Sequence, residues 1–442
     1  MTDRRPAAAD LEGPATDLAA DLEPGRTSAI AALRYRDFRL FWFGLLVSNI
    51  GTWMQMFGQG YLVVQLAIRD GVPQLAPLYL GLVGLARAVP GLSLGLFGGA
   101  LADRADRRRL LMVTQSSALV IAGILAGLTI FGHITVPEIL LLGALNSTIF
   151  AFDAPTRQSM VPRLVPKRDL LSAIGLNSAA FTGPQVIGPV IGGLIFAPFA
   201  ATPFVGLGIL FAINAASYLA VVIALFAMRP IPVTGRTRDL PMLDSIREGL
   251  RYIRRDPVIR WVILLSVACS LFARPYIQLL PAFAHDVLRI GAVELSWMLA
   301  AAGIGSLAGA LVTASLGAFQ RRGLLLLGSV GAFGLALAGF AVQHELLATL
   351  PFLVALGLVT MLFNGMGNTI LQTKSPDHLR GRVMSVYTMV FLGLMPLGSM
   401  ILGVVGTFVG TGTALFGGGI VLLAATGYAT IREPRVRRLT AT

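Results

Sequence analysis

The stretch GGALADRADRRRLL, Gly98–Leu111, decides how the rest of the chain is laid out. A long apolar run ends in this stretch, a second one begins there, and six charged residues separate the two. This pattern predicts a very short turn between two membrane-spanning helices. Its four arginines indicate that this membrane edge is cytoplasmic, because basic residues are concentrated in cytoplasmic loops.

The composition predicts an all-α polytopic membrane protein. Of the 442 residues, 55% are hydrophobic and only 13% are charged, against about 25% charged residues in a typical soluble protein. The runs Leu170–Met228 and Val383–Ile431 contain no Asp, Glu, Lys or Arg. Each is long enough for two spans, since one span needs about 20 apolar residues. The basic residues that give the net charge of +13 fall at alternate hydrophobic boundaries, so we expect no nucleic-acid partner.

The sequence contains no residue pattern that is typical of catalysis or of metal binding. Cys269 is the only cysteine, which excludes an intrachain disulfide and a cysteine-based metal site. Neither Lys167 nor Lys374 follows a glycine, so the chain has no phosphate-binding P-loop for ATP. We therefore expect no enzyme, no cofactor and no bound metal.

The basic connections predict twelve spans arranged as two six-helix bundles. Nearly all basic residues then fall in cytoplasmic segments, and only Arg69 and Arg289 fall in outer ones. The expected location is the cell inner membrane, multi-pass, with both termini cytoplasmic. The predicted segments are a disordered cytoplasmic tail (1–32), a first bundle (33–228), a cytoplasmic linker with an amphipathic helix (229–257), a second bundle (258–432) and a cytoplasmic tail (433–442).

The two predicted halves resemble each other in plan. Both Asn146–Gly193 and Asn364–Gly403 contain an Asn in a helix, a basic connection, a Pro that starts a new stretch and a pair of glycines four or five residues apart. Parallel halves of this kind are typical of transporters, in which the substrate site lies between the halves at mid-membrane.

Two arginines lie deep inside predicted spans. Arg87 is about ten residues into its span, or roughly 15 Å below the membrane edge, and Arg274 is about two-thirds along the seventh span. A charge at such depth is costly unless it faces water, a partner or the protein interior. Two interpretations stay open for both residues: attraction of an anionic cargo, or a structural network.

At this point the residues resemble the major facilitator superfamily, over essentially residues 33–432. The superfamily pattern between spans two and three reads G-x-L-A-D-R-x-G-R-R/K, and Asp106 stands where it usually has Gly. The segment Gly188–Gly193, GPVIGG, resembles the superfamily's GPxxGG exporter motif. Stretches such as Arg36–Gln55 and Phe152–Pro166 resemble the branch that contains the enterobactin exporter and macrolide efflux proteins. The residues that match the first pattern are Gly99, Leu101, Ala102, Asp103, Arg104, Arg107 and Arg108.

The resemblance implies two sets of working residues. Helices one, four, seven and ten usually face the central cavity in this superfamily, which selects among the polar residues of the spans. With the two deep arginines, the candidate substrate-binding residues are Asn49, Gln55, Gln59, Arg87, Asn146, Arg274, Gln278, Asn364 and Asn368. The candidate gating residues are Gly99, Asp103, Arg104, Arg107, Asp153, Arg157, Gly188, Pro189, Gly192 and Gly193.

Specific contacts and a helix bend are expected for several of the gating residues. Asp103 is expected to face the N-terminus of helix eleven near Gly381, where the helix dipole favours a negative charge. Arg107 is expected to pair with Asp153 in an inner gate. The Gly and Pro residues of Gly188–Gly193 weaken one helix face and allow it to bend. The alternative for the charged residues is a topology signal plus solvated charge.

The function that the resemblance implies is secondary export of an amphipathic organic compound, a drug or a siderophore, by alternating access. The expected partners are the lipid bilayer, the small-molecule substrate and protons in antiport. No carboxylate lies deep in a span, so proton coupling follows from the resemblance alone, with Asp153 and then Asp286 as candidates. An importer or lipid mover of the same fold and a non-transporting membrane sensor or scaffold stay open as alternatives.

Overall fold

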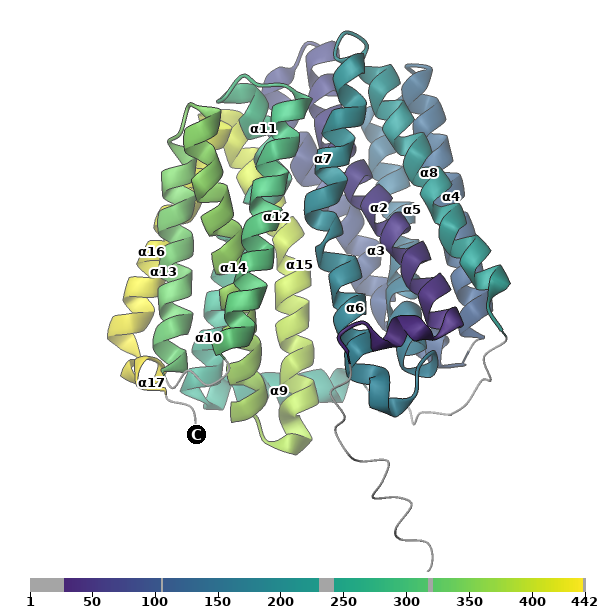
Figure 1. Ribbon diagram of the computed structural model, residues 1–442. Helices are drawn as coiled ribbons and strands as arrows, with labels where there is room; N and C mark the ends of the chain where they lie inside the picture. The colour runs from purple at the N-terminus through teal and green to yellow at the C-terminus, as the bar shows by residue number, and fades with distance from the viewer. Residues whose placement is uncertain (1–27, 105, 230–241, 317–320, 440–442) are drawn as a thin grey trace, which may run out of the picture.

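The computed structural model describes residues 28–104, 106–229, 242–316 and 321–439. Within these ranges, the side chains of residues 95–104, 242–247, 249 and 392 are outside the description. Every regular element in the described ranges is a helix, which confirms the predicted all-α class. The helices form two bundles that stand side by side, with α9 lying across one end (Figure 1).

The first bundle contains the helices before the linker. Short 3-10 turns precede or join several of them: η1 (Ala31–Arg34), η2 (Pro73–Leu75), η3 (Val161–Arg163), η4 (Lys167–Asp169) and η5 (Ala197–Phe199). The helices are α2 (Arg36–Arg69), α3 (Ala76–Arg104), α4 (Arg107–Ile130), α5 (Val136–Met160), α6 (Leu170–Thr182), α7 (Pro184–Phe196) and α8 (Pro203–Ala227).

The second bundle follows the linker helix α9 (Met242–Arg255) and ends in the short α17 (Pro434–Arg437). Its helices are α10 (Pro257–Ala268), the π-helical turn η6 (Cys269–Ala273), α11 (Tyr276–Asp286), α12 (Ala292–Ser315), α13 (Arg322–Ala341), α14 (Leu346–Lys374), α15 (Asp377–Val409) and α16 (Thr411–Arg432). We call the end of the bundles with α9, η1 and α17 the linker side, and the opposite end the far side (Figure 1).

Eleven helical segments of the described chain are long and apolar enough to cross a membrane. Helix α2, the predicted first span, is not among them, although its 34 residues exceed the length that a span needs. Its Asn and Gln side chains lower its mean hydropathy, and three of them, Asn49, Gln55 and Gln59, are buried within the protein. Helix α2 nevertheless lies alongside α7 and α8 within the first bundle (Figure 1).

Proline divides two of the spans. The predicted fifth span consists of α6 and α7, which meet at Gly183 and Pro184. The predicted seventh span consists of α10, η6 and α11, and Pro275 precedes α11. Proline has no N–H to donate to the preceding turn, so the regular hydrogen-bond ladder cannot continue through it. In the seventh span the backbone N–H of Arg274 instead bonds to the carbonyl of Cys269, 2.9 Å away.

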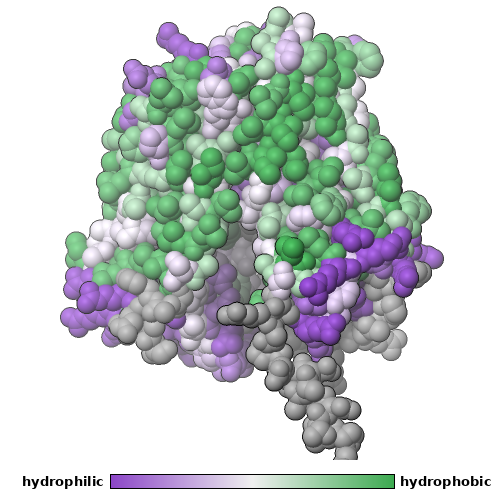
Figure 2. Space-filling view, in the orientation of Figure 1, coloured by the Kyte–Doolittle hydropathy of each residue, from purple (hydrophilic) through white to green (hydrophobic). Residues whose placement is uncertain are grey.

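The two bundles touch at the far side, where small residues let their backbones approach. A Cβ on Gly193 of α7 would lie 2.2 Å from Ser296 Oγ of α12. A Cβ on Gly403 of α15 would lie 2.4 Å from the carbonyl oxygen of Pro77 in α3. Side chains at these positions would push the bundles apart. Toward the linker side the halves separate, and Figure 2 shows a recess between them.

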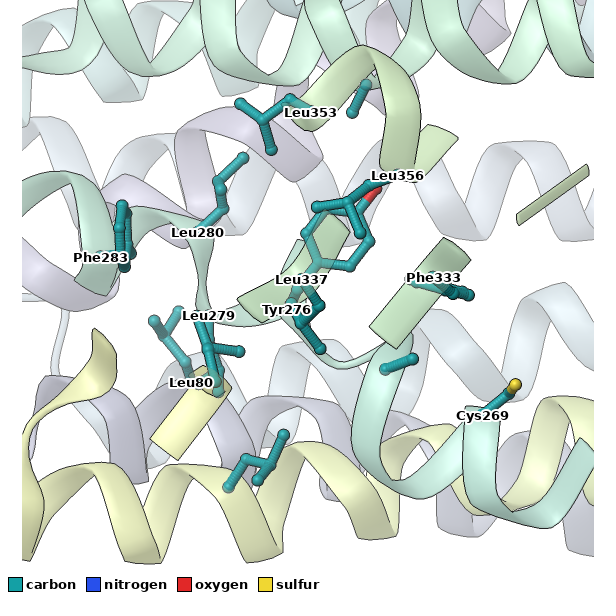
Figure 3. Packing of buried hydrophobic residues seen from close by; sticks show 14 of the residues in the cluster. Leu80, Cys269, Tyr276, Leu279, Leu280, Phe283, Phe333, Leu337, Leu353 and Leu356 are labelled. Carbon is teal, nitrogen blue, oxygen red and sulfur yellow. The ribbon is translucent and has the colours of Figure 1, made fainter. Parts of the chain in front are cut away.

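One apolar cluster contains buried residues of both bundles, and Figure 3 shows part of it. Leu280 and Phe283 of α11 and Phe333 of α13 are fully buried in it. Leu80 of α3 joins the same cluster from the first bundle. Burial of apolar side chains from both bundles in one cluster stabilises the contact between the bundles.

Helix α9 contacts the second bundle through its inner face. Ile253 is buried there, and Arg382 of α15 forms an ion pair with Glu248. Burial, with Asp256 nearby, raises the pKa of Tyr252 above its usual value. Helix α9 is therefore attached to the start of α15 on the linker side.

Part of the predicted N-terminal tail is folded. Ala31 and Ala32 are buried in η1, and Ser172 Oγ of α6 donates to the carbonyl of Ala29 over 2.8 Å. The described part of the first bundle thus begins a few residues before position 33. The rest of the predicted tail, residues 1–27, lies outside the described residues.

Candidate substrate cavity

A cavity of about 230 Å³ lies between the two bundles. Helices α2, α3 and α7 form its wall in the first bundle, and α11, α12, α14 and α15 form it in the second. Most of the lining is apolar, as an organic ligand would require. The apolar lining residues include Trp53, Met56, Phe57, Leu80, Val83, Ile277, Leu299, Met361 and Met395.

A second cavity of about 450 Å³ adjoins the first between α3, α5 and α15. The two share Arg87, Gln278 and Met395 as lining residues. The second cavity extends along α3 and α5 as far as Leu92 and Gln158, toward the linker side. The lining of the two cavities together thus extends from the centre of the molecule toward the linker side.

Arg87 of α3 lies in the walls of both cavities. Its Nη2 donates to Gln59 Oε1 of α2, and its carbonyl accepts a hydrogen bond from Ser147 Oγ of α5 over 2.5 Å. Its Nε is buried and has no hydrogen-bond partner among the described residues. No acidic residue lines either cavity, so its charge has no counter-ion there.

Arg274 reaches the first cavity from the second bundle. It follows the π-helical turn η6, a kind of helix irregularity that often occurs at functional sites. Its Nη1 donates to the carbonyl of Phe391 over 2.7 Å, and its guanidinium carbon lies 3.6 Å from the centre of the Phe391 ring. The charge is therefore stabilised by a carbonyl and an aromatic face rather than by a carboxylate.

Four of the nine predicted substrate-binding residues line the first cavity: Gln59, Arg87, Arg274 and Gln278. Gln59 holds Arg87, as described above. Gln278 of α11 donates through Nε2 to the carbonyl of Leu80 in α3 over 3.4 Å, so it bridges the two bundles.

Two other predicted residues bridge helices inside the first bundle. Asn49 donates through Nδ2 to the carbonyl of Ala180 in α6 over 2.8 Å, and its Oδ1 accepts from Arg157 over 3.3 Å. Gln55 Oε1 accepts from Asn214 Nδ2 of α8 over 2.6 Å. Both are buried and border neither cavity in this conformation.

The remaining three, Asn146, Asn364 and Asn368, are half-buried and also border neither cavity. Asn368 accepts a hydrogen bond from Gln372 one turn later in α14. The Oδ1 atom of Asn364 is buried with no partner in the described part of the chain.

Four further polar residues line the first cavity, although the sequence analysis did not select them: Gln185 of α7, Tyr276 of α11, Ser306 of α12 and Thr360 of α14. Gln185 was visible as a polar residue in the fifth span. It was passed over because helices one, four, seven and ten were favoured. The available signal was Pro184, which begins α7, and the start of α7 contacts α12 of the other bundle, where a Cβ on Gly303 would lie 3.1 Å from the Gln185 carbonyl oxygen.

The predicted gate contains a buried ion pair within α5. Asp153 pairs with Arg157, four residues later, and both side chains are almost fully buried. Asp153 Oδ1 also accepts from Thr114 Oγ1 over 2.9 Å and from Gln115 Nε2 over 2.7 Å, both on α4. This network ties α4 to α5, and Arg157 extends it to α2 through Asn49.

The ion-pair partner of Asp153 differs from the one expected. Arg107 was expected to pair with it, but the partner is Arg157, which the i,i+4 spacing on one helix face brings next to it. Arg107 is buried, and its Nε donates to Ser159 Oγ of α5 over 2.9 Å. The side chains of Asp103 and Arg104, with Gly99, lie outside the described residues, so their gating roles stay predictions.

Asp106, the departure from the superfamily pattern, caps α4. Its Oδ1 accepts from the backbone N–H groups of Arg108 and Arg109 over 2.9 and 3.3 Å. Arg108 in turn donates to the carbonyls of Leu225 and Phe226 at the end of α8, over 2.6 and 3.2 Å. The sequence analysis missed both roles, although an Asp directly before a helix is a common start signal.

The residues of Gly188–Gly193 lie at two helix contacts. Cβ atoms on Gly188 and Gly192 would meet Trp53 and Phe57 of α2 at 2.6 and 2.8 Å. Gly193 faces Ser296 of the other bundle, and Pro189 lines the first cavity. Helix α7 therefore lies between the polar helix α2 and the second bundle.

Two helical bundles around a shared central cavity define the class of protein as a transporter with the major facilitator fold. The chain belongs to the transmembrane secretion effector family of that superfamily, whose family model matches residues 27–440. The resemblance stated from the sequence is thereby confirmed.

Curated relatives with named cargo align over most of their length. The chain is 27% identical to the multidrug efflux pump Tap of Mycolicibacterium fortuitum over 90% of this chain and 96% of that one. It is 26% identical to the staphyloferrin A transporter of Staphylococcus aureus, over 80% and 86% of the two chains. It is 27% identical to the enterobactin exporter EntS of Shigella boydii, over 74% and 77%.

Solved structures share the fold. A bacterial homolog of the human lysosomal transporter Spinster, in an inward-facing and unoccupied conformation, matches with a TM-score of 0.69 at 14% identity and covers 91% of this chain and 98% of that one. A D-xylose–proton symporter matches with a TM-score of 0.62 at 16% identity, over 88% and 97% of the two chains. At these identities the likeness establishes the fold.

Proposed function

We propose that this chain is a secondary transporter that exports an amphipathic organic compound, a drug or a siderophore, by alternating access in exchange for protons. The observation that carries the proposal is the largely apolar cavity with polar residues from both bundles, adjoined by a second cavity whose lining extends toward the linker side. A ligand in such a cavity touches both bundles, so its binding depends on their relative position.

The proposed direction rests on topology and on the relatives. Arg107, Arg108 and Arg109 lie on the linker side, and Arg69 is one of the few basic residues on the far side. The positive-inside bias supports a cytoplasmic linker side, with both termini inside and the protein in the inner membrane. Relatives that are named as an enterobactin exporter and a multidrug efflux pump support export of an organic cargo.

Asp153 is our proposed proton-coupling residue. It is the buried carboxylate of a network that joins α2, α4 and α5, and protonation would remove the charge that holds Arg157. Loss of that charge changes the energy of the network and so can bias the position of these helices. Asp286, which accepts from Thr411 Oγ1 over 3.0 Å at the far side, is the second candidate.

Everted membrane vesicles with an acidic interior test the proposal. We expect proton-driven accumulation of enterobactin, staphyloferrin A or an amphipathic drug in vesicles that contain the protein, and none in vesicles that lack it. Collapse of the pH gradient with nigericin should stop accumulation. Cargo movement that is indifferent to the gradient would remove the antiport part, and accumulation only in right-side-out vesicles would identify an importer.

The Asp153→Asn variant separates coupling from translocation. We expect it to lose accumulation against a gradient while cargo exchange between two equal pools continues, because exchange needs no net proton movement. Equal loss of both activities in a folded variant would place the role of Asp153 in the structure rather than in coupling.

A further inference from the structure

Arg87 and Arg274 face one cavity from different bundles. Arg87 belongs to α3 of the first bundle, and Arg274 lies between η6 and α11 of the second. They are the only charged residues among those that line this cavity in the described structure. The pair is therefore divided between the two bodies that alternating access moves relative to each other.

The partners of both guanidinium groups are uncharged. A guanidinium has five N–H donors. Arg87 donates through Nη2 to the side-chain amide oxygen Oε1 of Gln59, and its Nε is buried without a partner in the described chain. Arg274 uses Nη1 on the Phe391 carbonyl and stacks on that ring. Two positive charges therefore remain without a counter-ion among the lining residues. Such charges are costly in a membrane interior unless water, a partner or a ligand compensates them, and a bound anion would do so.

We propose that the cavity selects an amphipathic organic anion with two separated acidic groups, one held by Arg87 and the other by Arg274. This inference rests on the proposed transport function. A planar guanidinium binds a carboxylate or phenolate through charge-assisted hydrogen bonds, and the apolar walls take the body between the acidic groups.

A cargo with two acidic groups also links the two bundles. A monoanion neutralises one arginine and leaves the other unpaired, whereas a dianion neutralises one in each bundle. The dianion is therefore favoured over a monoanion or a cation of the same shape. Gln278, which already bridges the bundles through the Leu80 carbonyl, lies in the same wall and provides a further amide donor.

Dyes that share one ring system but differ in charge test this selectivity. Fluorescein is a dianion at pH 8, its methyl ester is a monoanion, and rhodamine 123 is a cation. Binding to the purified full chain in nanodiscs is followed by fluorescence anisotropy, and transport by uptake into everted vesicles. We expect fluorescein to bind about tenfold or more tightly than either of the other dyes, because each lost charge-assisted bond costs about that factor.

The variants assign the selectivity to the two arginines. We expect Arg87→Gln and Arg274→Gln each to remove the preference for fluorescein over its methyl ester. Arg87→Lys and Arg274→Lys retain the positive charge and should keep the preference for fluorescein over rhodamine 123. That result would show that the substituted site still folds. Arg260→Gln is the matched control, because Arg260 lies in α10 of the same span and is exposed outside the cavity. It should behave as wild type.

Each outcome separates this inference from the proposed function. Tighter binding or faster transport of rhodamine 123 overturns the dianion inference and leaves export standing. Unchanged fluorescein binding in both Gln variants, or no fluorescein binding to the wild type, also overturns it. Arginine-dependent fluorescein binding without transport supports the dianion site and counts against the export function.

Discussion

Asp153 connects three helices through one carboxylate. One of its oxygens accepts from Thr114 and Gln115 of α4, and the other pairs with Arg157 of its own helix. Because both charges are buried, each depends on the other for compensation. The contacts among α2, α4 and α5 in this part of the first bundle thus depend on one ion pair.

Removal of one partner should be worse than removal of both. We expect Asp153→Asn to destabilise the protein by about 3 kcal/mol, because it leaves Arg157 buried without a counter-ion. The double variant Asp153→Asn, Arg157→Gln should recover part of that loss. Thermal unfolding of the purified variants measures both effects. A double variant less stable than the single one would contradict this account of the pair.

Adjacent arginines of the basic turn should differ in their effect on stability. Arg108 donates to two carbonyls at the end of α8, whereas the side chain of Arg109 is largely exposed. We expect Arg108→Ala to cost about 1 kcal/mol and Arg109→Ala to stay within about 0.5 kcal/mol. The same unfolding assay measures both, and equal losses would argue against a capping role for Arg108.

Residue roles were only partly predictable, because a sequence does not show which way a helix faces. Asn49 and Gln59 both lie in α2, but the ten residues between them turn the helix by about 280°. Gln59 consequently reaches the cavity, while Asn49 bonds to α6. The deep arginines were easier to find, since charge inside an apolar span stands out at any orientation.

At the scale of elements, α7 shows how glycine sets helix contacts. Gly188 and Gly192 allow α2 to approach, and Gly193 allows α12 of the other bundle to approach. The far side can therefore close only while position 193 has no side chain. The glycines of this helix were visible in the sequence, but only the structure shows which helices they contact.

A large side chain at position 193 should hold the far side open. We expect Gly193→Leu to abolish transport, because a Cβ there already overlaps Ser296 of α12. Gly175→Leu in α6 is the matched control, since a Cβ at that position meets nothing within 4 Å. Vesicle transport measures the difference. Normal transport by Gly193→Leu would show that far-side closure does not depend on this contact.

The sequence analysis did not predict the breaks in the spans, because proline alone does not mark them: Pro90 and Pro189 lie inside α3 and α7 without ending either helix. Pro184 follows the end of α6, and Pro275 precedes α11, which is consistent with the missing proline N–H. The π-helical turn before Arg274 was not predictable, because no residue type specifies an extra residue in a helix turn. This turn helps to set where the Arg274 side chain enters the cavity.

At the scale of the whole molecule, the structure has one closed side and one side on which the bundles separate. Buried apolar side chains and small-residue contacts hold the far side together, and the cavities extend toward the linker side. The two-bundle plan was predictable because most basic residues fall in alternate connections and the two halves repeat one pattern. The conformation was not predictable, since both faces of such a transporter derive from one sequence.

Distances between spin labels across the two sides test most directly whether the bundles rock about the cavity. One label pair joins Arg109 and Asp377 on the linker side, and the other joins Gln74 and Leu347 on the far side, all exposed positions. Both pairs are made as cysteines in a Cys269→Ser background, because Cys269 is the only native cysteine.

The measurement is made in nanodiscs at pH 5.5 and 8.5, with and without the cargo that the vesicle assay identifies. We predict that a shorter distance on the linker side accompanies a longer distance on the far side in at least one of these conditions. Distances that stay constant in every condition, or that change in the same direction on both sides, would contradict alternating access by these two bundles.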